Sequence, residues 1–391
     1  MAWLKFRADG LFTGQRLLGP EAVLVTDASG IVVDIIDAAT AGDEVRTLEG
    51  TLCPGFVNAH CHLELSHMAG AIPPGTGLPG FLGRIVEGRA AEEAAIQEAM
   101  RAAAARMHEQ GISAVGDICN TTASIPLKRG GPMRWVNFIE VLSATDAKAP
   151  ERLQHFRALR DRFLAEPGLD GHPPIASLAA HAPYSTSPLS FRLINEETAG
   201  RVTSLHNQET AAEDELYRSG TGEFLPFFQR LGYAGSPMPV TGLSSLQSVL
   251  PHYDRGQRLL LVHNTFTSPE DLAFGAAHAA QAGLDIVYCL CPNANLYIEG
   301  RLPPVADLLG SGARVVIGTD SLASNTDLSI ASEMRTLLRH VPGLTLETTL
   351  RWATSEGALA LGLQDSLGSL RIGTRPGLVW LDRDMQASRL C

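Results

Sequence analysis

One stretch of this sequence, residues 54–64, decides the fold: it reads PGFVNAHCHLE. Its apolar half predicts a buried β-strand that ends in His60 and His62. Because side chains alternate between the two faces of a strand, these two histidines point the same way and Cys61 points away. Two imidazoles on one face, at the end of an apolar strand, form half of a metal site. An isolated pair is more often structural, so the assignment depends on the rest of the chain.

Apolar runs that alternate with helical segments fill the middle of the chain. Eight strands, each followed by a helix, predict an α/β fold of the (β/α)8 TIM-barrel type. A doubly wound open sheet gives the same local pattern, but no GxGxxG follows the first strand. The Pro/Gly-rich residues 70–80 predict a loop over the first strand's end. The predicted strands cover residues 55–60, 113–118, 134–141, 175–181, 202–206, 259–263, 284–290 and 314–319. The predicted helices cover residues 89–110, 151–164, 188–198, 222–231, 268–282, 305–309, 328–339 and 347–361.

The two ends of the chain have a different character from its middle. Short β-like runs at 22–26 and 31–36 are separated by a Ser-Gly turn, and the last residues repeat this pattern. We therefore predict one small β-domain built from residues 1–52 and 368–391, beside a barrel of residues 53–367. Two unrelated tails are the alternative.

Composition limits the class of protein. The 391 residues suit one large barrel with an appendage, and 45% hydrophobic against 19% charged residues is typical of a globular chain. No apolar run approaches the roughly 20 residues that span a bilayer. Six cysteines without a CxxC motif predict reduced thiols in a cytoplasmic protein. A net charge of −11 without a Lys/Arg cluster argues against nucleic acid or a membrane surface. We expect a small molecule and water as partners, and a homodimer remains open.

Polar side chains follow several predicted strands at the end where barrel enzymes carry their chemistry. Three imidazoles and a carboxylate there can bind one divalent cation and leave a position for water. Zn²⁺ is the default for this donor set, with Fe²⁺ as the alternative. The predicted metal ligands are His60, His62, His206 and Asp320.

A proton carrier is predicted beside this metal. Glu209 lies three residues after His206, so the strand must end near His206 for both to face the site. From the following loop Glu209 can serve as a proton shuttle; the alternative, a solvated loop glutamate, suits Glu213 and Glu215 better. His263, at the end of the sixth strand, can orient the water or stabilise charge on it.

The scarcity of lysine bears on the number of metal ions. Two-metal hydrolases of this architecture bridge their ions with a carboxylated lysine at a strand end. No lysine follows Lys148, and both Lys128 and Lys148 fall in predicted loops beside the third strand. The sequence therefore favours one metal.

Taken together, these motifs resemble the amidohydrolase superfamily over almost the whole chain. Within it, the pattern is similar to the single-metal deaminases of adenine nucleosides. The resemblance implies the barrel with a flanking β-domain, the four metal ligands above, proton transfer by Glu209 and polarisation by His263. It also implies that His181 contacts the substrate, and that Asp320 can accept a proton from the water. The motifs that carry it are PGFVNAHCH (54–62), HAPYS (181–185), HNQE (206–209), LVHN (261–264) and IGTDSLASNTDLSIASEMR (317–335).

The subfamily is suggested by Glu64, residues 78–84 and residues 291–297, which look most like aminodeoxyfutalosine deaminases. This resemblance implies conversion of aminodeoxyfutalosine to futalosine in menaquinone biosynthesis. Deaminases of S-adenosylhomocysteine, methylthioadenosine or adenosine are the next alternative, and guanine, cytosine or triazine aminohydrolases follow. Amide or ester hydrolysis by the same site is a further class. A non-catalytic scaffold would be free to lose ligands, whereas this chain keeps all of them.

Four more residues are candidate substrate contacts. Glu64 could accept from a substrate hydroxyl or amino group, or could cap a helix. Arg84 could pair with a substrate carboxylate if residues 78–84 form a loop over the site, or could be solvated. Ser324 and Asn325 could line the pocket after the eighth strand.

Overall fold

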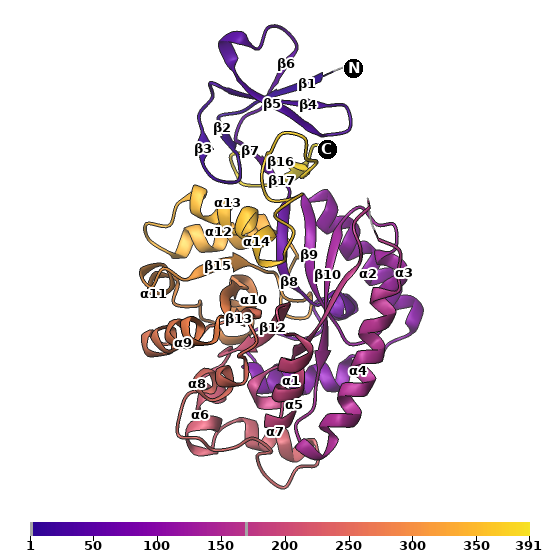
Figure 1. Cartoon of the computed structure of the whole chain (residues 1–391), viewed down its shortest axis with the longest axis vertical. Coiled ribbons are helices and arrows are strands. Elements are labelled where there is room, and N and C mark those ends of the chain that lie inside the picture. The colour runs from indigo at the N-terminus through magenta and orange to yellow at the C-terminus, as the bar shows by residue number, and fades with distance from the viewer. Residues whose placement is uncertain (1–2, 169–170) are drawn as a thin grey trace.

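The barrel is built from eight parallel strands, and a smaller β-domain lies above it in the computed structural model (Figure 1). The structure describes residues 3–168 and 171–391. All eight strands predicted from the sequence are present at nearly the same bounds. They are β8 (Phe56–Cys61), β9 (Ile112–Cys119), β10 (Arg134–Val141), β11 (Ile175–Ala180), β12 (Val202–Asn207), β13 (Arg258–His263), β14 (Asp285–Leu290) and β15 (Arg314–Ile317).

Two seams close these strands into a barrel. The strands pair in sequence order as β8-β9-β10-β11 and as β12-β13-β14-β15. At one seam the His206 N–H donates to the carbonyl of His181 at 3.0 Å. At the other seam a parallel bridge joins Cys61 to Asp320, and the Thr319 N–H donates to the carbonyl of His60 at 2.9 Å. The sequential order confirms the predicted (β/α)8 barrel and excludes the doubly wound sheet.

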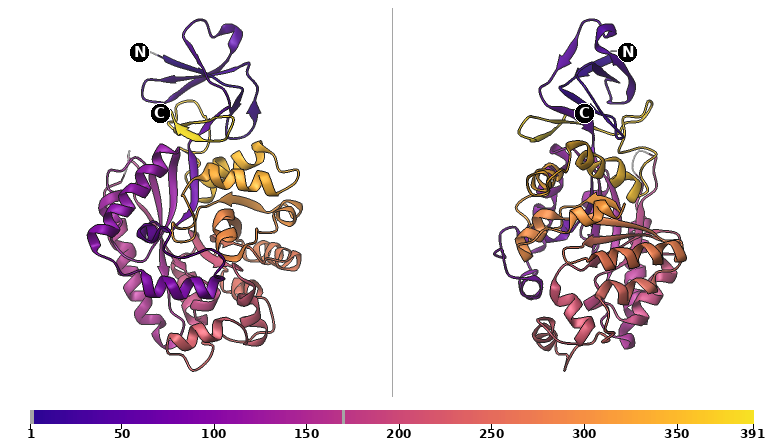
Figure 2. Two further views of the ribbon diagram at one scale, coloured as in Figure 1. Left: turned by 180° about the vertical axis from the view of Figure 1, so that it is seen from behind. Right: turned by 90° about the vertical axis from the view of Figure 1, so that its left-hand side faces the viewer.

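Helices surround the barrel (Figure 2). Local signals fix several of them: Ser268 and Asp271 form a capping box at the start of α9, and left-handed Gly283 ends it. The helices that follow β8 to β12 are α1 (Leu78–Gly88), α2 (Glu93–Glu109), α3 (Ile125–Lys128), α4 (Ala149–Leu164), α5 (Pro188–Glu197), α6 (Ala211–Ser219), α7 (Phe224–Arg230) and α8 (Ser245–Val249). Those after β13 to β15 are α9 (Pro269–Ala282), α10 (Pro292–Glu299), α11 (Val305–Gly310), α12 (Ile330–His340), α13 (Leu346–Ala353) and α14 (Ser355–Ala360).

The structure corrects the prediction in several segments. The loop predicted over residues 70–80 ends earlier, because α1 starts at Leu78 with a proline in its first turn. The predicted helix 347–361 is two helices, since Thr354 leaves the helical conformation with φ −132° and ψ −87°. Helices α3, α6, α8 and α10 were not predicted. Among residues 3–168 and 171–391, no helix has both the length and the apolar character needed to cross a membrane.

The small β-domain contains strands from both ends of the chain. One sheet has the order β5-β4-β1-β6, and the other has the order β17-β16-β7-β2-β3. In the second sheet β7 lies between N-terminal β2 and C-terminal β16. The strands of the first sheet are β1 (Trp3–Arg7), β4 (Ala22–Asp27), β5 (Val32–Asp37) and β6 (Val45–Thr47). Those of the second are β2 (Gly10–Phe12), β3 (Leu17–Leu18), β7 (Thr51–Pro54), β16 (Leu378–Leu381) and β17 (Ala387–Arg389).

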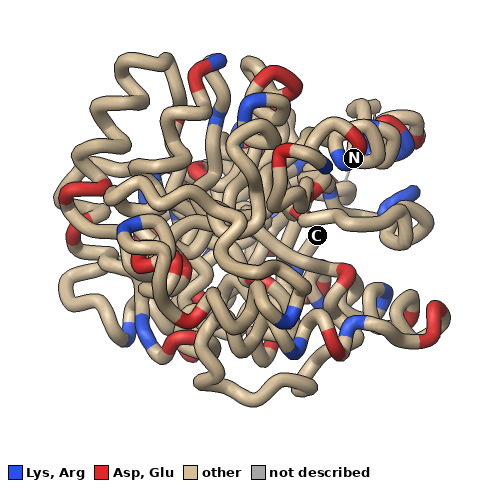
Figure 3. The backbone as a smooth tube through the Cα atoms, turned by 90° about the horizontal axis from the view of Figure 1, so that it is seen from below, with Lys and Arg blue, Asp and Glu red and all other residues tan. Residues whose placement is uncertain are grey.

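The link from β7 to β8 sets the direction of the barrel. Gly55 joins them, and a Cβ there would lie 1.9 Å from Ser113 Oγ, so only glycine fits. Strand β8 therefore begins beside the small domain and runs away from it. Because all barrel strands are parallel, their C-terminal ends lie at the far end of the barrel. Seen from that side, acidic and basic residues are interspersed and form no face of one sign among the residues drawn (Figure 3).

Candidate metal centre and active-site cavity

The four predicted metal ligands lie together at the C-terminal ends of the strands. The Nε2 atoms of His60 and His62 lie 3.6 and 3.4 Å from Asp320 Oδ1. The Nε2 atoms of His62 and His206 lie 3.1 Å apart. Around a tetrahedral Zn²⁺ with bonds of about 2.0–2.1 Å, neighbouring ligand atoms are about 3.3 Å apart. The observed separations therefore fit the edges of one such coordination shell.

The protonation of the histidines also suits a metal. His60 is fully buried, and neither of its ring nitrogens has a hydrogen-bond partner among the described residues. His206 Nδ1 donates to the carbonyl of His181 at 2.7 Å, which leaves the lone pair of Nε2 directed to the site. Burial lowers the pKa of His206 well below its ordinary value, and the neighbouring His60 and His181 lower it further. A neutral imidazole is the form that binds a metal.

Asp320 supplies the carboxylate in its ionised form. It follows β15 in the left-handed region, at φ 58°. Burial opposes ionisation, but the nearby His60, His62 and His263 outweigh it and hold the pKa of Asp320 well below its ordinary value. The Ser324 hydroxyl donates to Asp320 Oδ2.

Ser324 and Asn325 were candidate substrate contacts, and the structure places neither in the cavity wall. Both side chains turn back under Asp320. The Ser324 hydroxyl is engaged in its hydrogen bond to Asp320. The Asn325 amide donates to the Thr319 carbonyl at 2.9 Å and to Glu333 Oε1 at 2.7 Å. They hold the loop after β15, and Ser321 lines the cavity from that loop instead.

Glu209 faces the same site from the loop after β12. Its Oε2 lies 3.5 Å from His263 Nε2, and only 3% of the residue is exposed. Burial raises the pKa of Glu209 well above its ordinary value, and the nearby Asp320 and Glu299 raise it further. A carboxyl that stays protonated near neutral pH can donate a proton in catalysis.

His263 lies at the end of β13, in the left-handed region at φ 76°. The Asn295 amide nitrogen lies 3.1 Å from His263 Nδ1 and donates to it, so the ring proton is assigned to Nε2, which faces Glu209 and the site. Burial lowers the pKa of His263 to about 3, against the opposing effect of Asp320. The neutral ring can therefore donate a hydrogen bond from Nε2.

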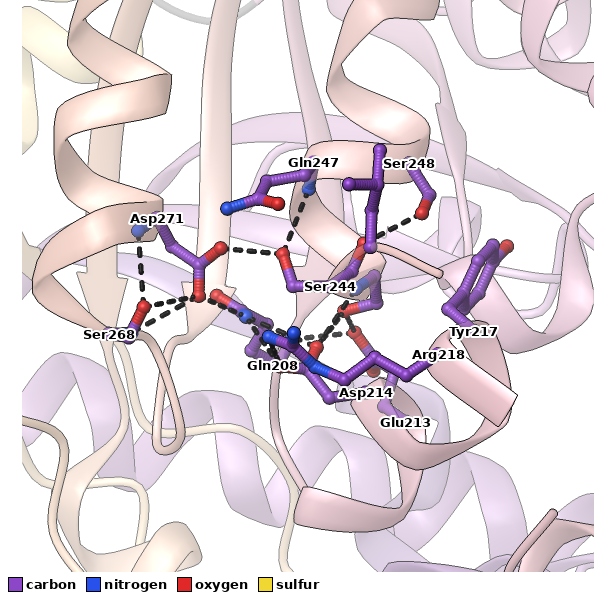
Figure 4. A network of polar contacts seen from close by, with 12 residues as sticks. Gln208, Glu213, Asp214, Tyr217, Arg218, Ser244, Gln247, Ser248, Ser268 and Asp271 are labelled. Carbon is purple, nitrogen blue, oxygen red and sulfur yellow. Dashed lines mark hydrogen bonds and ion pairs between the residues drawn. The ribbon is translucent and has the colours of Figure 1, made fainter. Parts of the chain in front are cut away.

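A buried polar network holds the backbone that carries Glu209 (Figure 4). Gln208 has φ 44°, a conformation that L-residues rarely adopt. Its N–H donates to Glu213 Oε1 at 2.8 Å, and its amide donates to Asp271 Oδ2 at 2.8 Å. Ser245 donates to the same Glu213 oxygen at 2.6 Å. Glu213, interpreted from sequence as a solvated loop residue, is instead fully buried on α6, and burial raises its pKa to about 8.

Glu64 and Arg84 are not part of the cavity wall. The Glu64 carboxylate accepts from the backbone N–H groups of Asn120 and Thr121 at 3.2 and 3.1 Å, and from the Thr121 hydroxyl at 3.0 Å. This ties the 3₁₀ turn Leu63–Met68 to the loop after β9, and burial raises the pKa of Glu64 to about 7. Arg84 is exposed on helix α1 rather than on a loop, so its side chain does not reach the site.

The site opens into a cavity of about 360 Å³. His181 lines it and pairs through Nδ1 with the Ser185 hydroxyl at 2.6 Å. Sequence reasoning missed two of its charged residues, Glu140 and Arg89. A polar residue near the end of a predicted strand was the available signal for Glu140. The apolar wall comes mainly from α1, α7 and their neighbours, and consists of Leu65, Leu78, Phe81, Leu82, Ile85, Val86, Phe227, Phe228, Leu231 and Tyr233.

Residues 51–389 match the model of the amidohydrolase family, and the chain belongs to that family of metal-dependent enzymes. It is 28% identical to an adenosine deaminase of Helicobacter pylori, over 80% of this chain and 75% of that protein. It is 27% identical to an aminodeoxyfutalosine deaminase of Deinococcus radiodurans, over 85% of this chain and 81% of that protein.

Solved structures show the same architecture. Helicobacter pylori aminofutalosine deaminase in complex with methylthio-coformycin superposes with a TM-score of 0.80 at 25% identity, over 97% of this chain and 92% of that one. A zinc-bound adenosine deaminase of Xanthomonas campestris has a TM-score of 0.69 at 22% identity, over 97% of this chain and 84% of that one, and supports the fold alone.

Proposed function

We propose that this chain is a metal-dependent deaminase that hydrolyses the amino group from the adenine ring of a 5′-modified nucleoside. The observation that carries the proposal is the pairing of the buried Glu209 with His263, next to three histidines and Asp320 whose ligand atoms fit one cation. Membership of the amidohydrolase family and relatives named as nucleoside deaminases support a hydrolytic deaminase.

His60, His62, His206 and Asp320 would hold the metal. Three nitrogens and one oxygen favour Zn²⁺, with Fe²⁺ as the alternative. When bound, such a cation supplies Lewis acidity and makes a nucleophile available from water at neutral pH.

Side chains of the protein carry out the proton transfers. Protonated Glu209 donates to the ring nitrogen beside the amino-bearing carbon, which makes that carbon electrophilic. Ionised Asp320 accepts a proton from the attacking water, and His263 Nε2–H stabilises the oxygen that adds to the ring. The proton held by Asp320 is delivered to the amino group, which leaves as ammonia, and the added hydroxyl gives its proton to Glu209, which restores the acid and leaves a carbonyl on the ring. The balance is one water consumed and one ammonia released.

The cavity wall supports a substrate with an apolar, anionic 5′ side. Helices α1 and α7 offer an apolar surface that adenosine alone would not need. Arg89 is the only lysine or arginine lining the cavity within residues 3–168 and 171–391. Its carbonyl pairs with His67 Nε2 at 3.0 Å, which fixes the end of α1. An aromatic carboxylate fits both features, and aminodeoxyfutalosine, converted to futalosine in menaquinone biosynthesis, is our best candidate.

A panel of nucleosides tests this proposal. Purified, metal-loaded protein is offered aminodeoxyfutalosine, S-adenosylhomocysteine, methylthioadenosine and adenosine, and ammonia release is measured. We expect the highest kcat/KM for aminodeoxyfutalosine. If S-adenosylhomocysteine or methylthioadenosine is preferred, the deaminase class holds and the side group is wrong. If only guanine or cytosine reacts, the adenine assignment fails.

A further inference from the structure

Glu140 lines the cavity, and one of its carboxylate oxygens is used by no described side chain. It lies near the end of β10, is only 4% exposed, and lines the cavity. Its Oε2 accepts from the Asn120 amide at 2.9 Å, whereas its Oε1 has no hydrogen-bond partner among the described residues. A buried acceptor left without a donor is destabilising, so this oxygen is suited to a donor supplied by a ligand.

The polar groups nearest to the free oxygen of Glu140 lie too far away to form a good hydrogen bond with it. A carboxylate oxygen of Glu140 and one ring nitrogen each of His181 and His206 lie within 4.8 Å of one another. Glu140 Oε1 is 3.7 Å from His206 Nδ1. These separations exceed a good hydrogen bond. A second cation does not fit, because His206 Nδ1 already donates to the carbonyl of His181 at 2.7 Å. A donor group placed between Glu140 and His181 would satisfy the free oxygen of Glu140.

We infer that Glu140 binds a sugar hydroxyl of the nucleoside and thereby selects ribonucleosides over deoxynucleosides. This inference rests on the proposed function. The donors of an adenine nucleoside are its amino group and its sugar hydroxyls. The amino-bearing carbon must lie at Glu209 and Asp320 for the reaction, which leaves the hydroxyls for Glu140. An ammonium on a long 5′ side would lie farther out, whereas Glu140 adjoins the metal ligand His206.

The test compares ribose and deoxyribose substrates in the wild type and in Glu140→Gln. The variant keeps the size of the side chain but replaces one acceptor oxygen by an NH₂ group. The wild type should favour the best nucleoside of the panel over its 2′-deoxy or 3′-deoxy analogue by about 10- to 100-fold in kcat/KM, as expected for a hydrogen bond to a charged group. Glu140→Gln should lose most of that preference, mainly through slower turnover of the ribonucleoside.

Two controls separate binding from a structural role. Glu64→Gln alters a second buried glutamate that also contacts Asn120 but lies outside the cavity, and it should change ribose and deoxyribose substrates by the same factor. The metal content of Glu140→Gln should equal that of the wild type. A loss of metal would mean that Glu140 acts through His206, and would overturn the inference.

Other outcomes are equally decisive. A wild type that deaminates ribose and deoxyribose substrates at equal rates overturns the inference without any variant. Equal losses on both substrates in Glu140→Gln also overturn it, because a structural carboxylate does not distinguish substrates. If the wild type releases ammonia from no adenine nucleoside, the proposed function fails first and the inference falls with it.

Discussion

The buried Glu213 should make the stability of the protein depend on pH. Burial raises its pKa to about 8 in the folded chain, from an ordinary value of 4.5. Between these values the folded state holds a proton that the unfolded state has released. The contribution of Glu213 to stability is therefore complete below the unfolded pKa and is lost as pH rises through the folded pKa. At about 1.4 kcal/mol per pKa unit, the loss between pH 5 and 8 is on the order of 4 kcal/mol.

Glu213→Gln removes this dependence. The amide resembles the protonated acid, and its oxygen can still accept from the Gln208 N–H and from Ser245, the two bonds made by Glu213 Oε1. The variant should be about as stable as the wild type at pH 5. At pH 8 it should be more stable by a few kcal/mol, since no charge has to be buried.

Urea unfolding at pH 5, 6, 7 and 8 measures the effect. Metal-free protein in chelator is used, because metal binding is itself pH-dependent. Glu215→Gln is the matched control: this glutamate lies on the same helix but is exposed, so its difference from the wild type should stay flat with pH. A constant difference between Glu213→Gln and the wild type across the four pH values would refute the reasoning.

Three further predictions concern the site. Glu209→Gln should retain metal but lose kcat by roughly 10²- to 10⁴-fold, because an amide cannot donate and accept the proton in turn; activity within a few-fold would place the shuttle elsewhere. His62→Ala should lose metal and activity together, and elemental analysis of the wild type should give one ion per chain, not two. Arg89→Ala should lower kcat/KM for a carboxylate-bearing substrate by about 5-fold, the upper range for an exposed ion pair, and spare adenosine. Arg84→Ala is its control, and equal losses in the two variants would remove Arg89 from the site.

The barrel was predictable because its signals are local. Each strand is a short apolar run, each is followed by a helical segment, and parallel strands then bring their C-terminal ends together. The common direction of the parallel strands therefore predicted that His60, His206 and Asp320 would lie near one another, although they are far apart in sequence. The small helices α6 and α10 were not predictable in the same way, since their apolar faces are short and depend on packing against the barrel.

The hydrogen bonds that hold the site residues in place could not be predicted from local sequence signals. The hydrogen bond from Ser324 to Asp320 and that from Gln208 to Glu213 depend on left-handed backbone conformations at Asp320 and Gln208. Nothing in the residue types alone requires these conformations, because neither residue is a glycine. Pattern reasoning therefore selected the groups that the structure brings together at the proposed site, and it misassigned several groups that hold them.

Arg84 and Arg89 show how one physical idea selects different residues in a loop and in a helix. Taken as a loop, residues 78–84 offer Arg84 as the nearest cation. As a helix with about 3.6 residues per turn, the same segment has one face formed by every third or fourth residue. The cavity-lining residues Leu78, Phe81, Leu82, Ile85, Val86 and Arg89 follow that spacing, and Arg84 falls outside it. Glu299 fixes the start of this helix by accepting from the Leu78 N–H at 2.7 Å. The stripe thus runs from an anchored end, along an apolar wall, to one guanidinium, and this is the order of groups that the aryl carboxylate of the proposed substrate would meet.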